Sequence, residues 1–167
     1  MSEFEPRPIS RDAIPAALEK AERYRLLNEP HEAISICRDV LRAHPDHQVA
    51  LVTLILALSD RFGRATSADP DEARTLAARL EDDYRRAYYT GIVCERRAKA
   101  LLRGSVPGAA STAHDWLRMA MEWYEKAEPL RPEGNDDPIL RWNACVRLMR
   151  DRELGPRPED AYEQPIE

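Results

Sequence analysis

The chain has 167 residues, a formal net charge of -5, and only two Phe and six Gly. This length suits one ordinary domain, which can bury a sufficient core without a disulfide or a metal. The negative charge argues against nucleic acid and membrane surfaces as partners, because both attract clustered Lys and Arg. The scarcity of glycine leaves too few turn residues for an all-β fold.

Residues 1–10 are polar and proline-containing, with Glu3 and Glu5 where a secretory signal would have a basic start and an apolar run. We expect a flexible N-terminal tail here and a cytoplasmic protein. The three cysteines agree with a reducing compartment, because their number is odd and no CxxC pair occurs.

Residues 11–152 carry helical periodicity nearly throughout, which predicts a single helical domain. Its seven helices are expected at about 11–28, 30–43, 46–62, 70–82, 83–103, 111–128 and 137–152. Asp69 followed by Pro70 is a strong helix start, since it combines an N-cap with proline at the first helical position. No Gly or Pro separates the fourth predicted helix from the fifth, so the two could be continuous. Residues 153–167 are acidic and proline-rich, which predicts a flexible C-terminal tail.

A spacing of small and apolar residues recurs along these helices. It is complete, with a closing proline, at Ala33, Cys37, Val40 and Pro45, and again at Ala120, Tyr124, Ala127 and Pro132. It recurs without the proline at Ala73, Ala77 and Leu80.

This pattern resembles the tetratricopeptide repeat (TPR) family, in which a helix pair of about 34 residues repeats and a proline ends the second helix. Residues 120–136 carry the closest match. The resemblance implies an all-α fold with about three TPR-like antiparallel helix pairs and a C-terminal capping helix in a right-handed α-solenoid. The chain departs from the family at Lys20, where the family prefers Leu. Its matching segments, which begin at Ala33, Ala73 and Ala120, also lie farther apart than the family's spacing of about 34 residues.

What the resemblance implies for function is a non-catalytic protein–protein interaction module, an adaptor or scaffold that binds a peptide or helix of a partner on its concave face. The first helix of each pair lines that face in the family. The matching positions here are Leu18, Glu22, Arg25, Val52, Leu56, Tyr88, Ile92 and Arg96. Glu22 would repel a partner's terminal carboxylate, which favours an amphipathic helix or an extended apolar segment instead. The alternatives are a self-assembling scaffold that forms a homo-oligomer and a subunit of an enzyme complex.

The sequence offers little for catalysis, and we expect no catalytic residue, cofactor or metal. His44 and His47 flank Asp46, but they fall in a predicted turn without a third ligand nearby. The cysteines sit in apolar helical patterns, where burial would make them inert. The basic stretch 85–103 on the fifth predicted helix admits two interpretations, a solvated face paired with nearby acids or a site for an acidic peptide.

Overall fold

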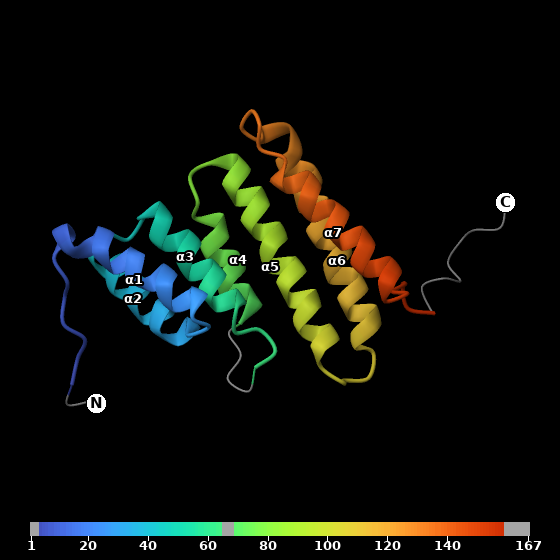
Figure 1. The fold of residues 1–167 in the computed structure, drawn as a ribbon, viewed down its shortest axis with the longest axis horizontal. Helices are drawn as coiled ribbons and strands as arrows, with labels where there is room; N and C mark the ends of the chain where they lie inside the picture. Colours follow the sequence, from blue (N-terminus) through green and yellow to red (C-terminus); the bar gives the residue numbers. More distant parts are fainter. Residues whose placement is uncertain (1–3, 65–68, 159–167) are drawn as a thin grey trace.

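The computed structural model describes residues 4–64 and 69–158, and these form seven α-helices without a strand (Figure 1). The helices are α1 (Ile14–Leu26), α2 (Pro30–Ala43), α3 (Gln48–Ser59), α4 (Pro70–Ala78), α5 (Asp83–Arg103), α6 (Ala109–Ala127) and α7 (Asp137–Asp151). Two 3-10 turns, η1 (Arg11–Ala13) and η2 (Glu128–Leu130), precede α1 and follow α6. The all-α prediction is confirmed, and each predicted helix has a counterpart.

Local capping groups explain where several helices begin. The Asp69 carboxylate accepts a hydrogen bond from the backbone N–H of Asp71 at 2.9 Å, which confirms the predicted start of α4. The break between α4 and α5, which the pattern left open, is present because Asp82 caps α5 by accepting from the Arg85 N–H at 2.8 Å. His47 caps α3 through its ring Nδ1, so α3 begins at Gln48 and not at residue 46.

The helices pack mainly against their neighbours in the chain, and α1, α3 and α5 also contact one another in that order. Figure 1 shows them crossing the molecule in chain order, from α1 and α2 at one end to α6 and α7 at the other. The most extensive contact joins α5 to α6. Among the described residues, no helix has the length and apolar character that a membrane span requires.

Two clusters of buried side chains form the core, and α5 contributes to both. The first joins the four helices α1, α2, α3 and α4. It includes Leu51 and Ile55 of α3, together with Val93 of α5. The second joins α5, α6 and α7 around Leu117 and Tyr124. All three cysteines are buried, as predicted.

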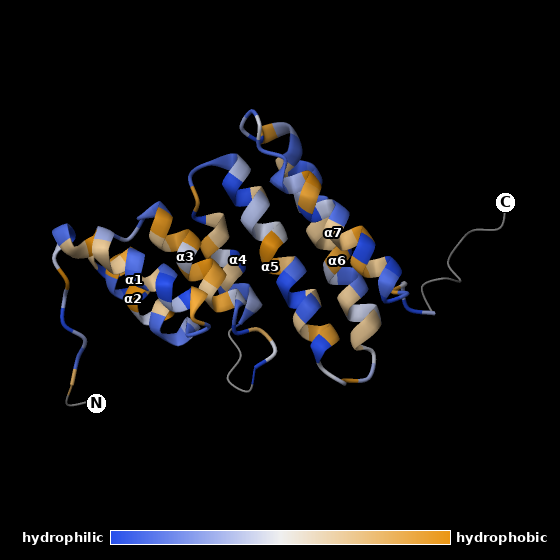
Figure 2. Cartoon of the chain, viewed as in Figure 1, coloured by the Kyte–Doolittle hydropathy of each residue, from blue (hydrophilic) through white to orange (hydrophobic). Residues whose placement is uncertain are grey.

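Helix α3 is rich in apolar residues, as its colouring in Figure 2 shows. Leu51 and Ile55 are fully buried, whereas Val49 is 53% exposed and Leu56 is half-buried. The prediction that one side of this helix reaches the surface is therefore confirmed.

Both ends of the described chain contact the core. Residues 4–10 are extended and mostly exposed, and they lie against the domain, since Arg42 donates to the Pro6 carbonyl at 2.9 Å and Ile9 packs on the first core cluster. Of the predicted C-terminal tail, residues 153–158 are described, and Leu154 packs on the second core cluster. Residues 1–3 and 159–167 of the two predicted tails lie outside the described part of the chain.

Candidate binding groove

Two adjoining cavities open where α1, α3, α5 and α7 approach one another, and together we call them the groove. The first, the basic cavity, has a volume of about 540 Å³ and is lined by five cationic side chains: Arg25, Arg64, Arg96, Lys99 and Arg103. The second, the aromatic cavity, has a volume of about 440 Å³ and an apolar wall formed by Leu56, Tyr88, Tyr89 and Ile92. Arg96 and Lys99 line both cavities, so the two adjoin.

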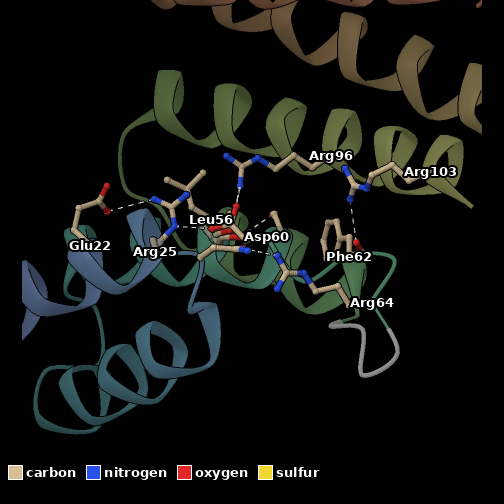
Figure 3. Close-up of polar contacts among 11 residues, drawn as sticks. Glu22, Arg25, Leu56, Asp60, Phe62, Arg64, Arg96 and Arg103 are labelled. Atoms are coloured by element: carbon tan, nitrogen blue, oxygen red, sulfur yellow. Dashed lines mark hydrogen bonds and ion pairs between the residues drawn. The ribbon is translucent and has the colours of Figure 1, made fainter.

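Asp60 holds two of the arginines of the basic cavity in place (Figure 3). The residue directly follows α3, and its carboxylate accepts from Arg25 Nε at 2.9 Å and from Arg96 Nη1 at 2.5 Å. Arg96 also donates to the Leu56 carbonyl at 3.1 Å, and Arg25 also pairs with Glu22 at 3.3 Å. Asp60 thus ties the ends of α1 and α3 to the middle of α5.

The other two arginines of the basic cavity hydrogen-bond to neutral oxygen atoms. Arg64 donates to Asn28 Oδ1 at 2.6 Å, and Arg103 donates to the Phe62 carbonyl at 3.2 Å. Gly63 directs the chain toward Arg64 with a φ of 77°, in the left-handed region that favours glycine. Among the described residues, Asp60 is the one acidic residue that lines this cavity, so these residues make the basic cavity positive although the whole chain is negative.

A buried carboxylate forms the base of the aromatic cavity. Glu95 is only 2% exposed, and it accepts from Tyr124 Oη at 2.6 Å, from Lys99 Nζ at 2.5 Å and from the guanidinium of Arg141 at two positions. Burial alone would raise the pKa of Glu95, but the hydrogen bonds from Arg141, Lys99 and Tyr124 outweigh it and the pKa is lowered. The carboxylate therefore remains ionised and joins α5, α6 and α7.

The tyrosines of the aromatic cavity form a packed series. The Tyr88 ring stacks on Tyr84 at a centroid distance of 5.7 Å and meets Tyr89 edge to face at 5.2 Å. Burial raises the pKa of Tyr88 to about 12, so its hydroxyl is neutral at physiological pH. The cavity thus offers an apolar wall beside charged side chains of both signs.

The structure brings together five of the eight residues that the resemblance indicated. Arg25 lines the basic cavity, Leu56, Tyr88 and Ile92 line the aromatic cavity, and Arg96 lines both. The remaining three, Leu18, Glu22 and Val52, line neither. Leu18 is buried in the first core cluster, Glu22 is exposed beside Arg25, and Val52 packs partly against the first cluster.

Sequence reasoning missed the residues that complete the groove. Arg103 and Lys99 belong to the basic stretch 85–103 of the fifth predicted helix. Arg64 lies in a loop, where helical periodicity cannot predict which way a side chain points. Glu95 could have been noticed, since it follows Gly91 by four residues and precedes Ala98 by three, on a face of small residues.

The histidine pair considered for a metal has a structural role. The rings of His44 and His47 meet edge to face at 5.1 Å, and the His47 ring caps α3. No group of three or more His, Cys, Asp or Glu with metal-site geometry occurs within residues 4–64 and 69–158.

Comparison with known proteins identifies no family, because no family model, no curated protein and no solved structure matches this chain.

Proposed function

We propose that this protein is a non-catalytic module that binds a segment of another polypeptide in the groove. In this proposal α1, α3, α5 and α7 correspond to the first helices of TPR-like pairs and to the capping helix of a right-handed α-solenoid, and the groove is the concave face. The observation that carries the proposal is that two cavities, one with an apolar wall and one cationic, adjoin along successive helices.

The shape of the groove suits a chain segment. A peptide that lies across several helices can place alternate side chains into separate pockets, and each pocket then contributes to specificity. The two cavities differ in chemistry and share Arg96 and Lys99 as a boundary, so one segment can use both.

The titratable groups of the groove support a binding role over a catalytic one. A general acid or base at neutral pH needs a pKa near 7, whereas the pKa of Glu95 is lowered and that of Tyr88 is raised to about 12. Burial raises the pKa of Cys94, the nearest cysteine in sequence to Glu95, to about 11, which removes its nucleophilic thiolate.

Selection of peptides tests the proposal directly. The full chain is used to select binders from a display library of random 12-residue peptides, and their affinities are then measured for Leu56→Gln and Val49→Gln. Leu56 lines the aromatic cavity, while Val49 is an exposed apolar residue of the same helix that lines neither cavity. We expect roughly a tenfold loss for Leu56→Gln, as for the truncation of an interface anchor, and no loss for Val49→Gln.

Two results would contradict the proposed function. Either no peptide is enriched, or the enriched peptides bind the Leu56→Gln protein as tightly as the original protein. Thermal unfolding of both variants shows whether Leu56→Gln keeps the fold.

A further inference from the structure

We infer that the groove selects an acidic segment, whose carboxylate side chains enter the basic cavity while a neighbouring apolar side chain enters the aromatic cavity. This inference rests on the proposed function and adds the chemistry of the ligand to it.

The first argument is the charge balance of the basic cavity. Five cationic side chains line it against one carboxylate, that of Asp60. Among the described residues, Arg64 and Arg103 each make one hydrogen bond, and both acceptors are neutral oxygens. A guanidinium has five N–H donors in a planar fork that matches a carboxylate, so both arginines keep donors and charge for a ligand.

The second argument is preorganisation. The Arg25 side chain is only 12% exposed and Arg96 is 32% exposed, and both are held by Asp60. Side chains that are already ordered lose little conformational entropy when a ligand binds. An anion that reaches this cavity therefore meets cations that are fixed in position and partly shielded from water, where a charge-assisted hydrogen bond is stronger than at an exposed surface.

The third argument concerns the apolar side chain of the ligand. Leu56, Tyr88 and Tyr89 form an apolar wall beside the basic cavity, and such a pocket is suited to an aliphatic or aromatic anchor. Because Arg96 lies at the boundary of both cavities, the anchor and the acidic residues must be close together in the ligand's sequence.

The same observations disfavour a nucleic acid as the occupant. Nonspecific polynucleotide binding needs many phosphate contacts along a continuous basic surface. Here Glu22 pairs with Arg25 beside the basic cavity, Asp137 lines the aromatic cavity, and the chain has a net charge of -5. A short acidic peptide fits a confined basic cavity, whereas a long phosphate backbone would meet acidic side chains beyond it.

The test uses the peptides selected on the full chain and a pair of charge-reversal variants. The groove variant is Arg64→Glu with Arg103→Glu, and the matched control is Arg38→Glu with Arg118→Glu, at two exposed arginines of α2 and α6. Both double variants change the net charge equally. We call the peptides that lose affinity in Leu56→Gln the Leu56-dependent peptides, and we expect them to be enriched in Asp and Glu. Their affinity should fall at least about tenfold with the groove variant and less than about twofold with the control.

Salt provides a second readout, because the affinity of acidic peptides should fall as ionic strength rises. Replacing Glu by Gln and Asp by Asn in the best peptide should reproduce the loss seen with the groove variant. Thermal unfolding of both double variants shows that the comparison is made between folded proteins.

Two results would overturn the inference while leaving the proposed function standing. Leu56-dependent peptides could be neutral or basic, or their affinity could be unchanged in the groove variant. A gain in affinity on removing residues 159–167, which contain four acidic side chains, would assign the groove to the chain's own terminus. A polyuridine 12-mer that binds more tightly than the best peptide and competes with it would assign the groove to nucleic acid and would contradict the proposed function as well. A selection that yields no Leu56-dependent peptide contradicts the proposed function itself.

Discussion

Glu95 lies where α5, α6 and α7 meet, and it remains ionised although it is almost fully buried. Taking a carboxylate out of water is costly, and only close charged or polar partners offset that cost. Tyr124, Lys99 and Arg141 supply them from three helices, and the last two keep their charged ends partly in solvent. The main role of Glu95 is therefore to hold α5, α6 and α7 together, and its position also shapes the aromatic cavity.

Glu95→Gln should destabilise the protein by about 2 kcal/mol at pH 7, the usual range for hydrogen bonds to a charged group. The native pKa of Glu95 is lowered, so its contribution is fully present above the unfolded value near 4.5 and is lost as the pH falls through the lower native value. Urea unfolding at pH 7 and at several pH values below 4.5 should therefore show a difference between the two proteins that shrinks with acidity.

Glu122→Gln serves as the control for that comparison, because Glu122 is exposed on α6. Its effect on stability should stay within about 0.5 kcal/mol at every pH. A pH-independent loss in Glu95→Gln would show that Glu95 contributes through packing and not through its charge.

The three cysteines should not react with Ellman's reagent in the native protein at pH 8. Burial raises the pKa of Cys37 and of Cys145 to about 12 and that of Cys94 to about 11, so almost no thiolate is present. Unfolding in guanidinium chloride should release three reactive thiols per chain. A thiol that reacts at the rate of a free cysteine without denaturant would contradict the burial of that residue.

At the level of helices and turns, local signals were sufficient for much of the fold. Asp69 and Pro70 mark the start of α4 in the sequence alone, since capping and a fixed φ act over a few residues. Separate helices were predicted at 70–82 and 83–103, but a continuous helix stayed open, because Asp82 lies among other acidic residues and only the structure shows which of them caps α5.

The groove was predictable only where helical periodicity governs it. Leu56 and Arg96 lie on faces that the repeat pattern indicates, and the structure places both in the aromatic cavity. The pairing of Arg25 with Asp60 links residues 35 apart, and the position of Arg64 depends on a loop. Such contacts depend on how helices meet in space, which spacing along one helix does not determine.

Gly91→Ala should destabilise the protein, although alanine ordinarily stabilises a helix relative to glycine by about 0.5–1 kcal/mol. A Cβ at Gly91 would lie 2.6 Å from the ring of Tyr124, which is itself buried at the crossing of α5 and α6. Overpacking at such a site typically costs about 1–3 kcal/mol, which exceeds the gain in helix propensity. Urea unfolding measures the net effect.

Gly104→Ala is the matched control for that substitution. Gly104 caps the same helix with a φ of -87°, and a Cβ there would lie no closer than 3.5 Å to a neighbouring atom. Its stability should change by less than about 0.5 kcal/mol. If Gly91→Ala stabilises the protein instead, α5 and α6 do not cross as closely as the structure places them.

At the scale of the whole molecule, α5 connects the two halves. Val93 belongs to the first core cluster, whereas its neighbours Ile92 and Cys94 belong to the second. The same helix carries Arg96 and Lys99, which line both cavities. The groove therefore lies over the element that both halves of the core share, and its geometry depends on both.

The protein should be a monomer of 19.1 kDa in solution over about a hundredfold range of concentration. A two-fold dimer formed through the groove would bring the basic cavity against its own copy, and like charges repel across such an interface. Light scattering after size-exclusion chromatography measures the molar mass, and adding a selected acidic peptide should leave it unchanged apart from the peptide's own mass. A mass that rises with concentration and returns to the monomer value in Leu56→Gln, but not in Val49→Gln, would favour the self-assembling scaffold instead, with a second copy of the chain in the groove.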